Sequence, residues 1–309
     1  MNSIETVLIM LILILIGWFL SHIGWITSEV KSFLSKLILK ICVPTLIIVT
    51  FFDTLKKDMV SQLGYITIPF ISITLLFLLA LLLAKIMKIG KERHSIFVSM
   101  SVASNSMFFG FPIALGLFGT QAVPYVVFYY IANTIFFWGI LAPIIMRNGE
   151  RKPVSGFERL KNILNIPIVT VIISILLLLL NLQPPSLAIK IADYFSSLVT
   201  PLSSLVVGRI MYEIDFKKFK LDISILASLF MKFIVSPIII FTIAKLFTLP
   251  LLATMVFTIQ ASMPVMMQSA IVSEASGKDS EYGAVILSIS NILCLVLIPI
   301  YMWILNRIL

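Results

Sequence analysis

The chain has 309 residues, of which 60% are hydrophobic and 12% are charged, whereas soluble globular domains average roughly half apolar and about a quarter charged residues. This composition excludes a soluble globular domain and indicates a protein that crosses a membrane several times. The net charge of +9 requires no nucleic-acid partner, because the basic residues lie mainly in short loops between apolar runs.

Ten apolar runs are long enough to cross a bilayer core, which takes about 20 residues of helix. They cover approximately residues 4–20, 34–52, 62–87, 95–118, 121–146, 163–182, 187–208, 223–248, 250–273 and 282–305. No basic residue precedes the first run and no small-x-small cleavage pattern follows it. We therefore expect the first segment to be retained rather than removed as a signal peptide.

The basic residues are divided unequally between the two sides of the membrane. When the loops are assigned to alternate sides, 15 of the 23 Lys and Arg residues fall on one side, 5 on the other and three within the runs. The positive-inside rule places the richer side in the cytoplasm. The sequence thus predicts an all-α protein of the cell membrane whose N- and C-termini both lie outside the cytoplasm.

Similar residues recur about half a chain apart, in corresponding runs of the two halves. The pairs are Pro44 with Pro201, Pro112 with Pro264, and Asn133 with Asn291. Five spans per half is an odd number, so the second half begins on the opposite side of the membrane from the first. We predict two inverted five-helix repeats, residues 1–146 and 163–309, joined by a cytoplasmic connecting loop at 147–162.

The fourth and ninth runs each contain a polar interruption, at Asn105–Pro112 and at Gln260–Pro264. Gly110 and Pro112 disfavour a helix by roughly 1 and roughly 3 kcal/mol relative to Ala, and non-helical backbone inside a membrane must be buried in protein or line a cavity. Paired interruptions in two halves indicate the substrate site of a secondary transporter, because half-helix ends direct backbone dipoles at the cargo. The alternative for each proline is a kink that serves helix packing.

Polar side chains inside the other runs are further candidates for this site. Asn133 and Asn291 occupy matched positions, although a single Asn in a membrane helix is about as often a contact between helices as a ligand contact. Lys232 lies well inside the eighth run, and an intramembrane charge indicates a functional site. Its alternative is a lysine that extends toward the interface. Cys42 and Cys294 are interpreted as small buried hydrophobic residues.

No carboxylate is placed at the centre of a predicted span, so a buried acidic proton relay is disfavoured. Neutral oxygens and unwound carbonyls suit Na⁺. We predict no cofactor and no resident metal, with Na⁺ or H⁺ as the candidate coupling ion and Na⁺ placed near Asn105 and Gln260. Gln268 and Glu274 are the candidate coupling residues, and a solvated helix end is the alternative for Glu274.

The run Asn105-Ser-Met-Phe-Phe-Gly-Phe-Pro112, followed by Phe118-Gly119, resembles the Asn-(Thr/Ser)-x-(Phe/Tyr)-x-Gly-x-Pro signature in the fourth helix of the auxin efflux carrier family. Bacterial members of that family include malonate and malate permeases. The run Ala261-Ser-Met-Pro264-Val, with Ser290-Asn291, resembles the ninth and tenth helices, although Met263 stands where a small residue is expected. The similarity covers the full length.

This resemblance implies the fold shared with bile acid:sodium symporters, in which a transport domain moves against a scaffold domain like an elevator and helices 4 and 9 cross at their broken points. It also implies a homodimer and a small organic anion, a carboxylate, as cargo. The predicted substrate-binding residues are Asn105, Ser106, Gly110, Pro112, Asn133, Lys232, Gln260, Ser262, Pro264 and Asn291.

Three other classes of protein are alternatives to a carrier. An intramembrane enzyme is disfavoured, because the chain lacks His-Glu-x-x-His and Gly-x-Ser-x-Gly, and its two histidines, His22 and His94, fall in predicted loops. An anion channel is an alternative, since a crossing of broken helices can line a pore. An organic-anion sensor of the same fold is another. The substrate, the direction of transport and the coupling ion stay open.

Overall fold

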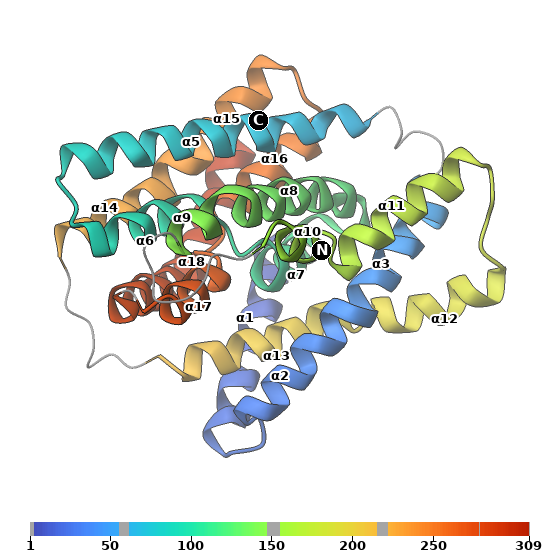
Figure 1. Cartoon of the computed structure of the whole chain (residues 1–309). Helices are drawn as coiled ribbons and strands as arrows, with labels where there is room; N and C mark the ends of the chain where they lie inside the picture. The colour runs from blue at the N-terminus through green and yellow to red at the C-terminus, as the bar shows by residue number, and fades with distance from the viewer. Residues whose placement is uncertain (1–2, 56–61, 147–154, 215–221, 278, 309) are drawn as a thin grey trace. The chain divides into compact units, whose positions relative to one another are not determined.

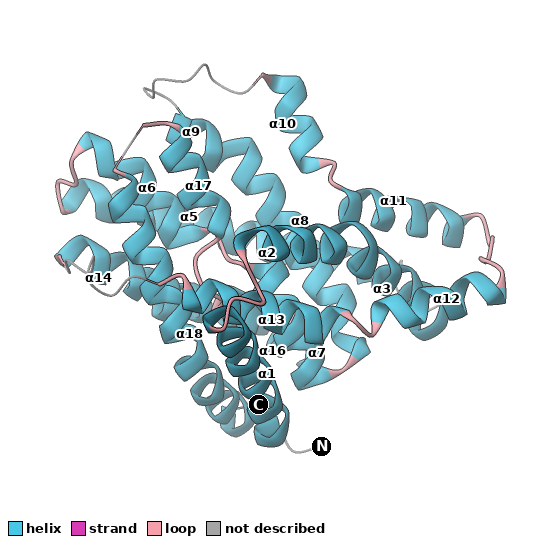
Figure 2. Cartoon of the chain, turned by 90° about the horizontal axis from the view of Figure 1, so that it is seen from below, coloured by secondary structure: helices cyan, strands magenta, loops and turns pink. Residues whose placement is uncertain are grey.

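The computed structural model describes residues 3–55, 62–146, 155–214, 222–277 and 279–308. Every regular element within these ranges is helical (Figures 1 and 2), which confirms the predicted all-helical class. Residues 147–154 of the predicted connecting loop and both terminal residues lie outside the described ranges.

Six helices in the described ranges are long and apolar enough to cross a membrane. A seventh span is added if Gly156–Ile163 and Ile166–Leu179, which meet at 66°, are counted as one. These helices agree with a membrane-embedded protein. The ten spans and the inverted repeats stay predictions.

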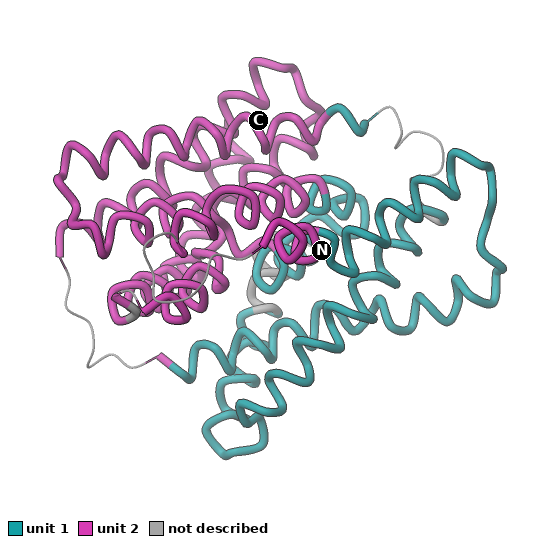
Figure 3. Tube along the Cα trace, in the orientation of Figure 1, with its two compact units in different colours: residues 1–64, 107–127, 164–213 teal, residues 65–106, 128–163, 214–309 magenta. Residues whose placement is uncertain are grey.

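The chain divides into two compact units (Figure 3). Unit 1 comprises residues 1–64, 107–127 and 164–213, and unit 2 comprises residues 65–106, 128–163 and 214–309. Each unit therefore takes segments from both predicted halves of the chain. The two inverted repeats with their boundaries stay a prediction.

Unit 1 is built from helices near the start and the middle of the chain. They are α1 (Ser3–His22), α2 (Ser28–Leu37), η1 (Ile38–Cys42), α3 (Val43–Val49), η2 (Thr50–Leu55), α7 (Phe111–Phe118), η5 (Thr120–Ala122), α11 (Ile166–Leu179), α12 (Ser186–Ser196) and α13 (Val199–Tyr212). α2 to η2 form one continuous helical segment, as do α12 and α13.

Helices α1 and α13 pack at very short range in unit 1. A Cβ atom added at Gly208 would lie 2.2 Å from the Ile14 carbonyl oxygen, and one added at Gly17 would lie 2.6 Å from the Leu205 carbonyl oxygen. Small residues let membrane helices approach until their backbones touch. Both positions therefore require glycine.

Unit 2 is built from the remaining helices. They are α5 (Thr67–Ile86), α6 (Lys91–Val102), η6 (Phe137–Leu141), α9 (Ala142–Met146), α10 (Gly156–Ile163), α14 (Ile223–Phe230), η8 (Met231–Val235), α15 (Ser236–Leu246), α16 (Leu251–Ala261), α17 (Met267–Ala275) and α18 (Ser280–Ile308). Three further elements, η3 (Leu63–Ile66), η4 (Ser106–Gly110) and α8 (Val123–Phe136), continue from one unit into the other.

Four of the described π-helical turns begin six residues before a proline. The pairs are η1 with Pro44, η4 with Pro112, η6 with Pro143, and η8 with Pro237. Proline has no N–H group and its ring collides with the carbonyl four residues earlier. Widening the preceding turn by one residue relieves this conflict without ending the helix.

The π-turn η8 shows how a carbonyl at such a proline is satisfied. Pro237 leaves the carbonyl of Phe233 without its α-helical donor, and the Tyr301 hydroxyl on α18 donates a hydrogen bond to that carbonyl. This contact joins α18 to the helical segment formed by α14, η8 and α15.

Candidate functional site

Two stretches of non-helical backbone meet inside unit 2. Helix α6 ends at Val102, and helical geometry returns at Ser106. Helix α16 ends at Ala261, and α17 begins at Met267. The first gap shares only Asn105 with the polar interruption predicted at Asn105–Pro112, because Ser106–Pro112 are helical in η4 and α7. The second gap contains the last three residues, Ser262–Pro264, of the interruption predicted at Gln260–Pro264.

The two stretches pair with each other as two strands do. Ser104 and Val265 form an isolated antiparallel bridge. Its hydrogen bonds are those from the Asn105 N–H to the Pro264 carbonyl, at 2.8 Å, and from the Met266 N–H to the Ala103 carbonyl, at 3.1 Å. Backbone groups that have left a helix are thereby satisfied without water. We call residues 103–105 and 264–266 the crossing.

The side chain of Asn133 holds the first stretch of the crossing. Its Oδ1 accepts a hydrogen bond from the Ser104 N–H at 3.0 Å, and its Nδ2 donates to the Ser104 carbonyl at 2.9 Å. One amide therefore satisfies both backbone groups of Ser104. Asn133 positions the backbone of the crossing through these contacts.

Lys232 reaches the same stretch from η8. Its side chain is fully buried, and its Nζ donates to the Ser104 hydroxyl and, at 3.4 Å, to the Val102 carbonyl. Tyr129 completes the cluster, since its hydroxyl lies 2.9 Å from the Ser104 Oγ. The Lys232 amine therefore lies at the break in α6, and its side chain is buried rather than extended toward the surface.

The second stretch is held by serines from neighbouring helices. The Ser290 Oγ on α18 accepts from the Val265 N–H at 3.2 Å. The Ser236 hydroxyl on α15 donates to the Ala261 carbonyl, also at 3.2 Å. Each stretch thus depends on side chains from helices that are distant in the sequence.

Several predicted site residues gather around the crossing. Asn105, Ser106, Gln260, Ser262 and Asn291 are each at most 4% exposed. Gln260 lies in the last turn of α16, and Asn291 follows Ser290 on α18. Among the described residues, no hydrogen-bond partner is found for the buried Asn291 Oδ1.

The other predicted residues lie elsewhere. Gly110 and Pro112 belong to unit 1, at the end of η4 and at the start of α7. Gln268 is half-buried in the first turn of α17, whereas Glu274 is exposed near the end of that helix. Glu274 is therefore separated from the crossing by most of α17.

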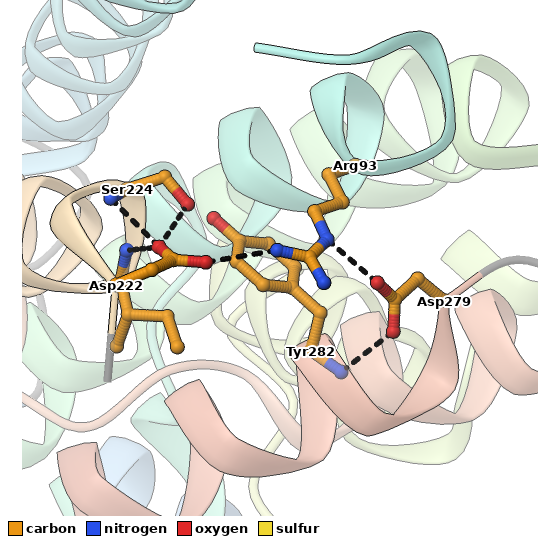
Figure 4. A network of polar contacts seen from close by, with 6 residues as sticks. Arg93, Asp222, Ser224, Asp279 and Tyr282 are labelled. Atoms are coloured by element: carbon orange, nitrogen blue, oxygen red, sulfur yellow. Dashed lines mark hydrogen bonds and ion pairs between the residues drawn. The ribbon is translucent and has the colours of Figure 1, made fainter. Parts of the chain in front are cut away.

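A second polar cluster joins three helix starts of unit 2 (Figure 4). Arg93, on the first turn of α6, contacts Asp222 at 2.8 Å and Asp279 at 2.6 Å, and its guanidinium carbon lies 4.8 Å from the centre of the Tyr282 ring. Asp222 also accepts from the N–H groups of Ser224 and Ile225 as the N-cap of α14. We call Arg93, Asp222 and Asp279 the arginine clasp.

The pKa of Asp222 reflects these contacts. Burial acts to raise the pKa, but hydrogen bonds from Ser224 and Ile225 and the charge of Arg93 outweigh burial and lower the pKa below its ordinary value. The ionised form of Asp222 is thus favoured over the protonated form more strongly in the folded chain than in the unfolded chain.

Two hollows of the molecule have a different chemistry from the crossing. One, of about 510 Å³, lies in unit 1 between α3, α11 and α12. The other, of about 550 Å³, lies in unit 2 between α5 and the α14–α15 segment. Their walls are overwhelmingly apolar side chains, which suit a hydrocarbon chain better than an anion.

Three residues with prominent contacts carry no sequence-based assignment to the site. Ser104 lies in the crossing, the Tyr129 hydroxyl contacts the Ser104 hydroxyl, and Arg93 binds Asp222 and Asp279 outside the crossing. The position of Ser104, directly before the polar interruption that begins at Asn105, is a usable signal. Tyr129 gave no signal beyond standing four residues before Asn133 on one helix face.

The chain is similar to known membrane transport proteins. A family described as Membrane transport protein matches residues 2–302. An uncharacterized transporter of Methanocaldococcus jannaschii is 29% identical over 315 residues, which cover 99% of each chain. An uncharacterized transporter of Methanothermobacter thermautotrophicus is 25% identical over 309 residues, which cover 97% of this chain and 98% of the relative.

Proposed function

The chain belongs to the Membrane transport protein family, that of the auxin efflux carriers, and we propose that it is a secondary transporter of small organic anions, chiefly carboxylates. Family membership and the names of its relatives establish a membrane-embedded transporter. The class of cargo, its site and its mode of movement are the proposed part.

One observation carries the proposal, namely the pairing of Ser104 with Val265 through extended backbone. In secondary transporters, substrate sites form where helices are interrupted and half-helix ends converge. α17 begins two residues after Val265, so the positive end of its dipole lies at the crossing. With the buried Lys232, this makes the crossing suited to a negatively charged cargo.

The residues of unit 2 take different roles in the proposal. Asn105, Ser106, Gln260, Ser262 and Asn291 are assigned to contact the cargo. Lys232 is assigned to supply the positive charge, and Pro264 is assigned to keep the helix interrupted. Asn133 is assigned to position the backbone of Ser104.

We assign unit 2 as the part that moves and unit 1 as the scaffold, in an elevator-type mechanism. The crossing and its supporting side chains all belong to unit 2, so they can move together without breaking the hydrogen bonds that hold the crossing. The interleaving of sequence segments in the two units supports this assignment, because the same interleaving is expected from a scaffold and a transport domain.

Three further features complete the proposal. Both termini are placed outside the cytoplasm by the distribution of basic residues, and a homodimer is proposed from the fold's relatives. Carrier behaviour is favoured over an open pore by the burial of the side chains at the crossing, which are at most 4% exposed.

Transport in proteoliposomes tests the function. The purified full chain is reconstituted, and entry of radiolabelled malonate, malate and succinate is measured against choline as a cation that should not be carried. We expect slow, saturable entry of at least one dicarboxylate. Asn105→Ala should lower that rate at least tenfold. Ser72→Ala is the matched control, because the Ser72 hydroxyl is also buried in unit 2 but has no hydrogen-bond partner among the described residues.

Failure would take a clear form. If no carboxylate enters, or if Asn105→Ala transports as fast as Ser72→Ala, then the cargo or the site is wrong. Large unitary currents from single reconstituted molecules would instead identify a channel.

A further inference from the structure

We infer that the ammonium group of Lys232 is a tethered cation that takes the place of a coupling metal ion at the crossing, so that anion binding there does not require Na⁺. This inference rests on the proposed function, because it concerns how the crossing holds an anion. It goes beyond it by naming the source of the positive charge.

The ligands of Lys232 are those that a metal cation would use. The Nζ is bonded to the carbonyl of Val102 and the hydroxyl of Ser104, two neutral oxygens at an interrupted helix. Unwound carbonyls and half-helix C-terminal ends coordinate the coupling ion in other carriers with broken helices. Val102 is the last residue of α6, so its carbonyl lies at the negative end of that helix dipole.

The position of the ammonium group is well defined by the fold. Lys232 is in the π-turn η8, which begins six residues before Pro237, and the Tyr301 hydroxyl joins the next residue, Phe233, to α18. The Lys232 side chain is fully buried. The tether is therefore short and anchored on two helices.

An ammonium group at Lys232 has no counter-ion among the described protein groups. Within the described ranges, no carboxylate lies within 4 Å of its Nζ, whereas the basic groups of Lys31, Arg93 and Arg209 each have such a carboxylate. A buried charge without a counter-ion is unfavourable. A carboxylate cargo at the crossing would supply the missing negative charge, which couples the charge of Lys232 to binding of the anion.

The test uses three variants of the full chain and their unfolding temperatures. Lys232→Met keeps an unbranched side chain that is one heavy atom shorter and removes the amine. Lys232→Ala removes the atoms that correspond to n-propylammonium, so that this small cation can be supplied from solution. Lys245→Met is the control, since Lys245 is an exposed lysine at the end of the same helical segment.

Three results are expected. The unfolding temperature of the wild type and its rise with malonate, malate or succinate stay the same when NaCl is replaced by choline chloride. Lys232→Met folds, because an apolar side chain replaces an unneutralised charge, but it loses the rise with the dicarboxylate. In Lys232→Ala, n-propylammonium restores the rise to at least half its wild-type size, and it has no such effect on Lys245→Met.

Two results would overturn the inference. One is stabilisation of the wild type by Na⁺ alone, in the absence of any carboxylate, because the cation site would then be open to a metal ion. The other is a dicarboxylate response that survives in Lys232→Met.

Failure of the proposed function gives a different pattern, in which no dicarboxylate shifts the wild type. The inference then depends on the cations alone. It stands if n-propylammonium raises the unfolding temperature of Lys232→Ala and Na⁺ does not stabilise the wild type, and it falls otherwise.

Discussion

Ser104 is the residue on which most contacts of the candidate site converge. Asn133 holds its backbone, Tyr129 and Lys232 contact its hydroxyl, and Val265 pairs with it across the crossing. A buried polar group is favourable only when all of its bonds are made. At the residue scale, the interruption in α6 is thus maintained by side chains rather than by the preferences of the interrupted stretch.

Asn133→Leu is predicted to destabilise the protein even without cargo. The change leaves the N–H and carbonyl of Ser104 buried without these partners, at about 1 to 3 kcal/mol for each group. Thermal unfolding of the purified protein measures this effect. Thr134→Val is the control, because the neighbouring Thr134 hydroxyl is buried and has no partner among the described residues. Equal unfolding temperatures for the two variants would contradict the positioning role of Asn133.

The helices of this chain are interrupted in a way that prolines explain. A π-turn begins six residues before Pro44, Pro112, Pro143 and Pro237, and one of these turns carries Lys232. At the element scale, each of these four prolines follows a widened turn, and the turn before Pro237 sets the direction of the Lys232 side chain.

Close packing of α1 on α13 is the second feature of the element scale. Gly208→Ala is predicted to destabilise the protein by roughly 1 to 3 kcal/mol or more, because overpacking forces the backbone apart and the new Cβ would lie 2.2 Å from the Ile14 carbonyl oxygen. Gly139→Ala is the control, since nothing lies within 4 Å of a Cβ at that position. The unfolding temperatures of both variants check the prediction, and a Gly208→Ala protein as stable as wild type would refute it.

The arginine clasp should make stability depend on pH at the acid end. The pKa of Asp222 is lower in the folded chain than in the unfolded chain, so its contribution is present above the unfolded value. It is lost as the pH falls through the folded value, below about pH 4.

Asp222→Asn isolates that charge, because Asn is also a favoured N-cap. We expect its unfolding temperature to be about 1 to 3 °C below wild type at pH 7, with the difference shrinking below pH 4 and in high salt. Glu92→Gln, an exposed neighbour of Arg93, should show no such pattern. A difference between Asp222→Asn and wild type that is constant across the pH range would argue against the clasp.

At the scale of the whole molecule, the proposed cargo brings charge across the membrane. One charge moving through 100 mV corresponds to about 2.3 kcal/mol, so a dicarboxylate dianion entering against an inside-negative potential is opposed by about twice that amount. The charge of Lys232 returns with the empty carrier, so it does not alter the total for a complete cycle.

Dicarboxylate entry into proteoliposomes is therefore predicted to respond to voltage. Diffusion potentials set with K⁺ and valinomycin should speed entry when the interior is positive and slow it when the interior is negative. The initial rate of malonate uptake at matched salt provides the measurement. Uptake that ignores the imposed potential would indicate compensating ions or an electroneutral exchange.

The sequence by itself determined that this is an all-helical membrane protein of a transporter family with polar interruptions at Asn105–Pro112 and Gln260–Pro264. These properties follow from local composition, from the length of apolar runs and from short motifs, all of which are carried by neighbouring residues. Lys232 and Asn133 were also identifiable, since polar groups are costly in hydrocarbon wherever they point.

Only the tertiary structure decided what those polar groups do. It showed that Asn133 binds the backbone of Ser104, that Lys232 faces Val102, and that Arg93 belongs to a clasp rather than to a solvated loop. The Lys232–Val102 and Arg93–Asp222 contacts join residues that are 130 and 129 positions apart in the sequence. The Asn133–Ser104 contact joins residues that are 29 positions apart. Their geometry depends on how helices rotate and cross, which hydrophobic periodicity leaves undetermined when a helix is apolar on all sides.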